Sequence, residues 1–140
     1  MSDIEKMAIV RRYFTDLWNR GDLDVADALI APGFGGAGVM PGPEAAKLYV
    51  SSYRSAFPNI QFRILSLQCQ DDLVMACWVG TGAHEPCSDG PDAAIVGDDR
   101  TMTGLSVYRL ENGKIAEMWI GAEAAQALAN ESKRTTHSSN

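Results

Sequence analysis

The hydrophobic pattern of this 140-residue chain changes its period near Ile60. Up to that point apolar residues recur every three or four positions, as they do on one face of a helix. Beyond it apolar and polar residues alternate, as Phe62, Arg63 and Ile64 do, which is the pattern of half-buried strands. Because the helical segments come first and the strands follow, without alternation of the two, the pattern predicts a fold of the α+β class.

Three helices are predicted before Ile60. Their expected ranges are 2–21, 22–31 and 43–57. The first begins with Ser2 and Glu5, which have the spacing of a capping box, so that each side chain can satisfy a backbone amide at the helix start. In the third helix Tyr49 and Tyr53 are four residues apart and therefore share one face.

Four strands are predicted after Ile60, in two hairpins with the ranges 60–84 and 101–120. The segment 85–100 is too long and too rich in turn-forming residues for a tight turn, so we expect a mobile connection. A short helix is predicted over 122–129, and the polar residues 130–140 predict a disordered tail after a single domain of residues 1–129. The expected architecture has three N-terminal helices packed on the concave face of a curved, mostly antiparallel sheet, a cone-like α+β barrel that encloses an apolar pocket.

The turn of the second hairpin contains the pair Asn-Gly at 112–113, the strongest turn signal in the chain. Two turn types fit this pair. A three-residue turn with a glycine bulge places Ser106 on the same face as Met118 and Ile120. A two-residue turn places Ser106 instead on the same face as Glu117. The residues alone leave both registers open.

The composition disfavours several classes of partner. The chain has 12 Lys+Arg and 18 Asp+Glu, and its formal net charge is −6. Nucleic acids and anionic membranes attract basic surfaces, so we expect neither as a partner. The longest uncharged run, residues 28–43, is interrupted by proline and glycine and is not expected to form a membrane helix. The three cysteines have no metal-binding spacing, which predicts free thiols and no metal in a cytoplasmic protein.

Few side chains are suited to acid–base chemistry. His84, at the end of the second predicted strand, is either a general acid or base at a pocket rim or an exposed strand-end residue. The hydroxyls of Tyr13, Tyr49 and Tyr53 lie on apolar helical faces, where a tyrosine either donates to a ligand or belongs to the core. Bulky residues that suit a core or an apolar ligand equally include Trp18, Trp78 and Met118.

Four segments of the chain, in this order, resemble the SnoaL-like polyketide cyclases, a branch of the nuclear-transport-factor-2-like superfamily that also contains ketosteroid isomerase. They are residues 13–31 (YFTDLWNRGDLDVADALIA), 56–62 (AFPNIQF), 78–84 (WVGTGAH) and 104–119 (GLSVYRLENGKIAEMW). The resemblance covers residues 5–128. It implies the cone-like fold, a hydrophobic small molecule as the ligand, no cofactor, and a homodimer formed through the convex face of the sheet.

The resemblance also suggests roles for individual positions. Tyr13 matches the first-helix tyrosine that donates to the developing oxyanion in ketosteroid isomerase. Ser106 stands where that isomerase has a protonated aspartate, and Met118 and Ile120 flank Trp119 where many cyclases have a histidine and an aspartate. The family's placement of functional residues favours the register in which Ser106, Met118 and Ile120 share the inner face. The candidates for substrate binding are Trp18, Tyr49, Tyr53, Trp78, Ser106, Met118 and Ile120.

Two functions are compatible with this pattern. The first is a cofactor-independent cyclase or isomerase of a hydrophobic polyketide-like molecule, with Tyr13 as the hydrogen-bond donor and His84 as the proton shuttle. The second is a non-catalytic small-molecule-binding or dimerisation module that has lost the acid and base residues of the family. A hydroxylase-like relative is a third alternative, which oxygen consumption would reveal.

Overall fold

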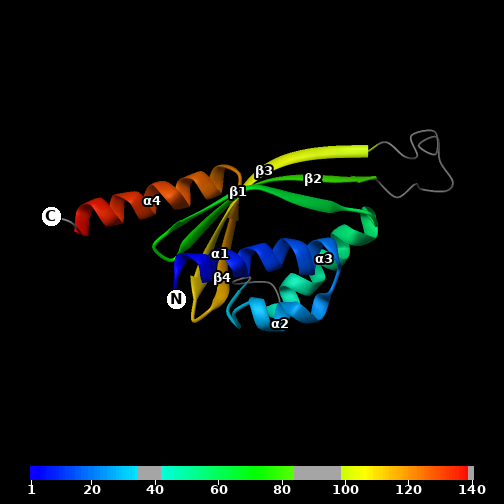
Figure 1. Ribbon diagram of the computed structural model, residues 1–140, viewed down its shortest axis with the longest axis horizontal. Helices are drawn as coiled ribbons and strands as arrows, with labels where there is room; N and C mark the ends of the chain where they lie inside the picture. The colour runs from blue at the N-terminus through cyan, green and yellow to red at the C-terminus, as the bar shows by residue number, and fades with distance from the viewer. Residues whose placement is uncertain (35–41, 84–98, 139–140) are drawn as a thin grey trace.

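The computed structural model describes residues 1–34, 42–83 and 99–138 (Figure 1). In chain order its elements are α1 (Asp3–Arg12), η1 (Tyr13–Asn19), η2 (Leu23–Val25), α2 (Ala26–Leu29), α3 (Pro43–Ala56), β1 (Gln61–Gln70), β2 (Leu73–Ala83), β3 (Asp99–Glu111), β4 (Lys114–Ile120) and α4 (Ala122–Ser138). The strands form one antiparallel sheet in the order β1-β2-β3-β4. The predicted α+β class, with helices before the strands, is confirmed.

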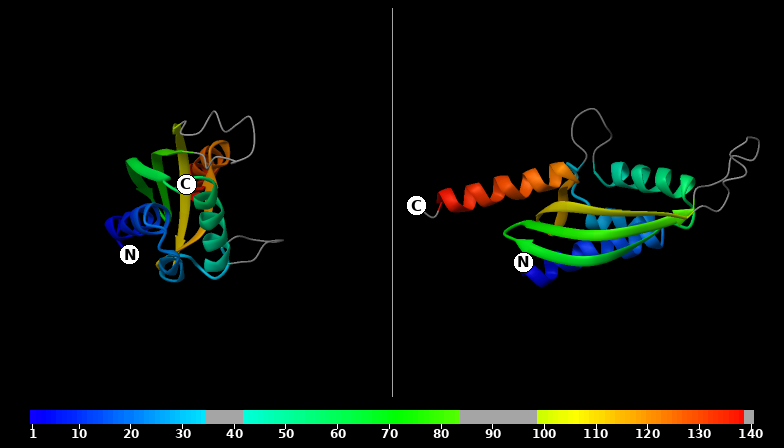
Figure 2. Two further views of the ribbon diagram at one scale, coloured as in Figure 1. Left: turned by 90° about the vertical axis from the view of Figure 1, so that its right-hand side faces the viewer. Right: turned by 90° about the horizontal axis from the view of Figure 1, so that it is seen from above.

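The two faces of the sheet are covered differently. The helical segments from α1 to α3 lie on one side of the strands (Figure 1), where they share the larger hydrophobic core with strand residues such as Val74 and Tyr108. On the opposite face Ala124 of α4 packs with Leu73 and Val107. Figure 2 shows that α4 then extends away from the body of the molecule. The described sheet is curved and open, with β1 and β4 as its edges, rather than a closed barrel.

The first helical segment runs from Asp3 to Asn19, but its hydrogen bonding changes along it. Ser2 and Glu5 form the predicted capping box at its start. From Tyr13 onward the segment is a π-helix, a form in which N–H groups bond to carbonyls five residues back. The predicted end at Gly21 is confirmed: Gly21 has a φ of +69°, in the left-handed region that favours glycine.

Asn19 ties the end of this segment to the first strand. Its side-chain carbonyl accepts from the Phe62 N–H at 2.6 Å, and its amide donates to the Phe62 carbonyl at 2.8 Å, as a paired strand residue would. The Arg54 guanidinium of α3 donates to the carbonyls of Trp18 and Asn19. A cation at this position also complements the negative end of the helix dipole. Asn19 therefore has a structural role, because its side chain connects the end of the first helical segment to β1.

The second hairpin combines parts of both predicted registers. Its turn is the two-residue type, because Asn112 and Gly113 have φ values of +54° and +79° and the residues flanking them pair. A bulge then leaves Ala116 without a partner in β3, so that Ser106 pairs with Ile120. Ser106, Met118 and Ile120 share one face, as expected. The bulge in β4, rather than a three-residue turn, places them there. A prediction made from the turn residues alone misses such a bulge, because no residue type in β4 indicates it.

The C-terminal helix differs from its prediction. The sequence predicts a helix over 122–129 followed by a disordered tail, whereas α4 runs from Ala122 to Ser138. Residues 130–138 contain neither glycine nor proline, and Glu131, Lys133 and Arg134 are good helix formers, so nothing in this stretch stops the helix. The helix therefore continues beyond its predicted end at residue 129.

Aromatic side chains fill the concave face on the side of β1 and β2. The ring centroids of Trp18 and Phe62 lie 5.0 Å apart, and those of Phe62 and Trp78 lie 5.2 Å apart. The Trp78 indole lies against Gly104 in the neighbouring strand, where a Cβ would overlap the ring. Its N–H donates to the Ser106 hydroxyl at 2.8 Å. This half of the concave face is solidly packed.

Candidate functional site

A pocket of about 910 Å³ opens between α3 and the edge strand β4. This volume lies within the range of small-molecule sites. Its wall is mainly apolar, and several of the residues there are glycine or alanine, which leave space that larger side chains would fill. The described lining residues are Tyr13, Ala31, Gly33, Phe34, Ala45, Ala46, Leu48, Tyr49, Ser52, Tyr53, Arg109, Glu111, Ala116, Glu117 and Met118.

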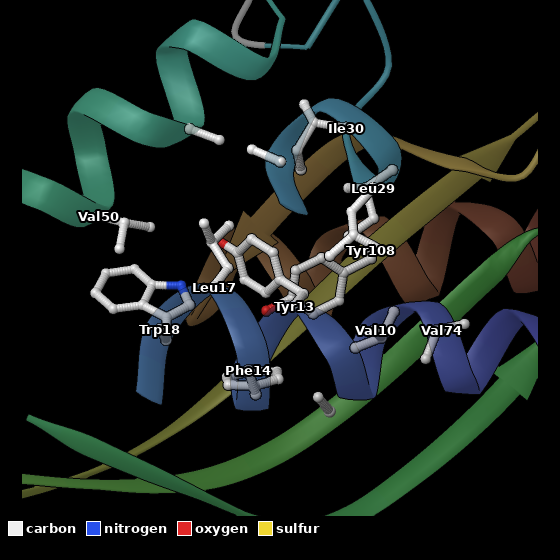
Figure 3. Close-up of a cluster of buried hydrophobic side chains, with 14 of the residues drawn as sticks. Val10, Tyr13, Phe14, Leu17, Trp18, Leu29, Ile30, Val50, Val74 and Tyr108 are labelled. Atoms are coloured by element: carbon white, nitrogen blue, oxygen red, sulfur yellow. The ribbon is translucent and has the colours of Figure 1, made fainter. Parts of the chain in front are cut away.

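Tyr13 forms the most buried polar part of this wall. It is the first residue of η1, is only 3% exposed, and packs edge-on against Phe14 and Tyr108 (Figure 3). Its hydroxyl donates to the Met118 sulfur at 3.5 Å. Burial raises the pKa of Tyr13 above its ordinary value, while the Trp18 side chain acts in the opposite direction. The hydroxyl therefore keeps its proton at neutral pH and can serve as a donor.

Tyr49 and Tyr53 project from α3 at the mouth of the pocket. Each is 39% exposed, and their ring centroids lie 5.1 Å apart. Both rings contact Trp18 edge-on, at centroid distances of 5.6 and 5.7 Å. Partial burial and the neighbouring Tyr53 raise the pKa of Tyr49 to about 12. The predicted shared face of these two tyrosines is confirmed, and that face lines the pocket.

A charged group forms the β4 side of the mouth. The Arg109 Nε lies 2.7 Å from a Glu117 carboxylate oxygen, and its Nη1 lies 3.2 Å from Glu111. Glu117 is exposed, and sequence reasoning did not single out Arg109. The missing signal was the hairpin register, which places Arg109 directly opposite Glu117.

Four residues predicted to bind substrate are not among the described residues that line this pocket. Trp18 and Ser106 are buried behind its wall, with 5% and 2% of their surfaces exposed. Trp78 lies in the packed half of the concave face, over Gly104. Ile120 ends β4 and is 42% exposed. The structure brings together Tyr13, Tyr49, Tyr53 and Met118 at the pocket.

His84 lies outside the described residues, as do residues 85–98 of the segment 85–100 that is expected to join the hairpins. In the part of the chain that the structure describes, no group of three or more His, Cys, Asp or Glu side chains is arranged to hold a metal ion. None of the helices there has both the length and the apolar character needed to cross a membrane.

The sequence matches the family model of the SnoaL-like polyketide cyclases over residues 8–130. None of the curated proteins compared with the chain is similar to it. The family match runs from the middle of α1 through β4 and into α4, and so includes every described residue of the pocket wall.

Several solved structures have the same fold at low sequence identity. TsrD from Streptomyces laurentii superposes with a TM-score of 0.71 at 14% identity, over 86% of this chain and 90% of that one. A SnoaL-like polyketide cyclase from Agrobacterium tumefaciens gives 0.65 at 17% identity, over 89% and 97%. IdmH from Streptomyces antibioticus gives 0.64 at 25% identity, over 89% and 98%. The fold is thus shared along nearly the whole of each chain.

Proposed function

The chain belongs to the SnoaL-like polyketide cyclase family, and from this premise we propose that it is a cofactor-independent cyclase or isomerase of a hydrophobic, polyketide-like small molecule. One observation carries the proposal. A buried tyrosine hydroxyl, that of Tyr13, lies in the wall of a mainly apolar pocket and donates only to a thioether among the described residues.

Tyr13 would stabilise the charge that develops on a substrate carbonyl oxygen as the ring closes or the double bond moves. A donor held in a dry pocket interacts more strongly with a developing oxyanion than it would in water. The Met118 sulfur is a weak acceptor, so a carbonyl oxygen replaces it at little cost. Because burial raises the pKa of Tyr13, its proton remains available throughout the neutral pH range.

The remaining catalysis would come from confinement and from one proton shuttle. Glu111 and Glu117, the two carboxylates in the described wall, are both ion-paired with Arg109, and neither is a free base. A pocket that holds a flexible substrate in a folded, reactive conformation removes much of the entropic barrier to ring closure. We assign the proton transfer to His84, and the orientation of the substrate rings to Tyr49 and Tyr53.

The same wall supports a second candidate function, a binding module without catalysis. Ser106 is enclosed and its hydroxyl accepts from Trp78, so it does not reach the pocket. Met118 presents a thioether, which does not transfer protons at neutral pH. Such a module would bind an apolar ligand and release it unchanged.

Replacement of the Tyr13 hydroxyl separates the two functions. The purified protein is incubated with a panel of linear aromatic polyketides, and products are followed by liquid chromatography and mass spectrometry. We expect turnover by the wild type and a loss of at least about tenfold in Tyr13→Phe. Tyr108→Phe is the matched control, because it removes an equally buried hydroxyl that does not line the pocket, and it should stay within about twofold. Unchanged turnover in a folded Tyr13→Phe would rule out this role, and tight binding without product would favour the module.

We also propose that the protein acts in the cytoplasm as a homodimer formed through the sheet face opposite the pocket. Cys77 pairs with Leu105 on that face, and both remain partly exposed, as does Val79. Light scattering at micromolar concentration should give the mass of a dimer, and Val79→Lys should give that of a monomer. A monomeric wild type would contradict the proposal.

A further inference from the structure

The charged rim of the pocket consists of Arg109, Glu111 and Glu117, and its charges do not cancel. The other described lining residues are uncharged. One guanidinium therefore faces two carboxylates, so that the described wall carries a net negative charge. A ligand in this pocket meets an apolar interior around the buried Tyr13 and an excess of negative charge at the mouth.

The hairpin register and the pleat of β3 position these three side chains. Arg109 lies directly opposite Glu117 in the ladder of β3 and β4, and Glu111 follows two residues later at the end of β3. Residues two apart on a strand point to the same side, and residues opposite each other are direct neighbours. Arg109 can therefore contact one carboxylate across the hairpin and the other along its own strand. Both contacts are made, at 2.7 and 3.2 Å.

Each of these contacts uses only one oxygen of its carboxylate. The Arg109 Nε donates to Oε1 of Glu117, and its Nη1 donates to Oε2 of Glu111. The second oxygens, Oε2 of Glu117 and Oε1 of Glu111, have no hydrogen-bond partner among the described residues. An ionised carboxylate accepts through both of its oxygens and donates nothing. The rim therefore retains two acceptors, on carboxylates that one arginine holds in place.

The cation of the rim is less accessible than its two anions. The side chain of Arg109 is 30% exposed, against 49% for Glu117 and 57% for Glu111. A ligand at the mouth thus meets carboxylate oxygens more readily than guanidinium N–H groups. The facing wall is different, because α3 presents the exposed side chains of Leu48 and Tyr49 there. The pocket therefore offers an apolar side along α3 and a side of hydrogen-bond acceptors along β4.

We propose that the charged rim recognises hydroxyl groups on one edge of a ring ligand: Glu117 and Glu111 accept hydrogen bonds from them, and Arg109 is the positioning residue that holds both carboxylates. The proposal rests on the proposed function, because it takes the pocket as the site of a ring molecule. Hydrogen bonds to a carboxylate are stronger than those between neutral groups, so a hydroxylated ring is favoured over its methyl ether. A carboxylated ring is disfavoured, because the rim repels it and the one cation of the described wall is already paired.

Three probes of one shape test this selection. They are a tetralone with a hydroxyl group on its aromatic ring, the methyl ether of that compound, and the tetralone with a carboxylate at the same position. Each Kd is measured by isothermal titration calorimetry, at a pH at which the phenol is protonated and the acid is ionised. We expect the wild type to bind the hydroxytetralone about fivefold to tenfold more tightly than the methyl ether, and the carboxylate most weakly. Equal Kd values for the hydroxytetralone and its methyl ether, or no binding of any probe, would overturn the proposal.

A change in the charge of the rim provides the second test. The double variant Glu111→Gln with Glu117→Gln keeps the size of both side chains but makes the rim positive. The preference for the hydroxytetralone should fall to about twofold, because an amide oxygen accepts less strongly than a carboxylate. The carboxylate probe should bind at least about fivefold more tightly than it does to the wild type. Asp24→Asn with Glu123→Gln is the matched control, because it removes the same charge at exposed positions outside the pocket wall. Equal changes in the control and in the rim variant would contradict recognition by the rim.

The positioning role of Arg109 is tested at constant charge. Arg109→Lys replaces a planar fork by a point charge, which does not fix the direction of either carboxylate. We expect the preference for the hydroxytetralone to fall about twofold to threefold, while the carboxylate remains the weakest probe. An unchanged preference would show that Arg109 contributes only its charge, and the positioning role would be wrong. If the wild type selects the hydroxytetralone but converts no polyketide, the proposed catalysis fails and recognition by the rim stands. Turnover together with equal Kd values would give the opposite result.

Discussion

The two halves of the concave face differ in what fills them, although one continuous sheet supports both. On the side of β1 and β2, Trp18, Phe62 and Trp78 pack edge to edge. On the side of β4, a pocket of about 910 Å³ remains. Each half contains one irregularity in its edge strand, between Ile64 and Ser66 in β1 and at Ala116 in β4, so the strands of the two halves are alike and the side chains differ in volume. The residues facing the pocket include Gly33, Ala45, Ala46 and Ala116.

This contrast determines which of the family's functional positions a ligand can reach. Ser106 falls in the packed half, under the Trp78 indole, whereas Tyr13 faces the open half. A substrate in the described pocket can therefore meet Tyr13 but not Ser106. Ser106 stands where ketosteroid isomerase has an aspartate, but this difference says little about whether the protein is active. The chemistry that we propose takes place in the other half.

The largest effect is expected from a side chain forced into the packed half. In Gly104→Val the new methyl groups overlap the Trp78 indole, so the ring must leave its site. We expect a loss of about 3 kcal/mol in the free energy of unfolding, typical of an overpacked core. Urea denaturation measures this loss. Gly33→Ala is the control, because its Cβ meets no atom and its stability should stay within about 0.5 kcal/mol. Equal losses in both variants would mean that the two halves are packed alike.

Filling the open half should affect binding and leave folding intact. Ala45 lies on α3 and lines the pocket, so Ala45→Leu projects a larger side chain into the space for ligand. We expect the Kd for an aromatic ligand, measured by tryptophan fluorescence, to rise at least about tenfold, which corresponds to about 1.4 kcal/mol. Ser55→Leu places the same side chain on an exposed part of α3 away from the pocket and should leave Kd unchanged. A larger rise in Kd for Ser55→Leu than for Ala45→Leu would show that the ligand binds outside this pocket.

Alkaline pH should distinguish the buried from the rim tyrosines. The folded-state pKa of Tyr13 and Tyr108 is raised by burial, so their neutral form is favoured in the folded protein. The contribution of these two tyrosines to the free energy of unfolding is complete below the unfolded-state pKa near 10. It is lost as the pH rises further, because their hydroxyls ionise in the unfolded chain before they do so in the folded protein. Between pH 8 and pH 11 we expect Tyr13→Phe to lose less stability than the wild type, by about 1 kcal/mol.

Tyr49 provides the comparison for this measurement. Its pKa is raised to about 12, but the side chain is more exposed, so Tyr49→Phe should reduce the alkaline loss less than Tyr13→Phe does. The measurement is the urea midpoint of each variant at the two pH values. A larger effect at Tyr49 would contradict the burial of Tyr13.

The smallest effect is expected at the charged rim. Glu117→Gln breaks the shorter ion pair of Arg109, but both side chains are substantially solvated. We expect at most about 0.5 kcal/mol of lost stability, and none in 1 M salt. Glu123→Gln, at an exposed position of α4, is the control for the change in net charge. A loss of several kcal/mol would show that the rim is a structural part of the pocket and not a solvated edge.

Much of the fold can be predicted from the sequence, because local patterns produce it. The change of hydrophobic period near Ile60 separates helices from strands, Ser2 and Glu5 mark the first helix start, and the Asn-Gly pair marks the second hairpin. The tyrosines of α3 were placed on one face by their spacing alone. Each of these signals acts over a few residues, within the reach of propensity and periodicity.

The site is less predictable because it depends on packing between distant segments. The same buried positions 13, 14, 17 and 18 fit an α-helical or a π-helical segment, so the pattern does not reveal the change of helix type at Tyr13. Trp78 was predicted at the substrate because it is bulky and apolar, but the absence of a Cβ at Gly104 lets it pack flat on the sheet. The Arg109 ion pairs depended on a register that the turn alone did not define.

The bulge at Ala116 also has a consequence for how relatives of this chain can diverge. Because the bulge shifts the pairing of β4 by one residue, its loss at constant length would pair Glu117 with Tyr108 and Met118 with Val107. Glu117 and Trp119 would then face inward and Met118 outward. Deletion of Ala116 would instead remove the bulge together with its extra residue and keep Met118 opposite Tyr108, so the apolar wall tolerates a change of one residue in length at this point.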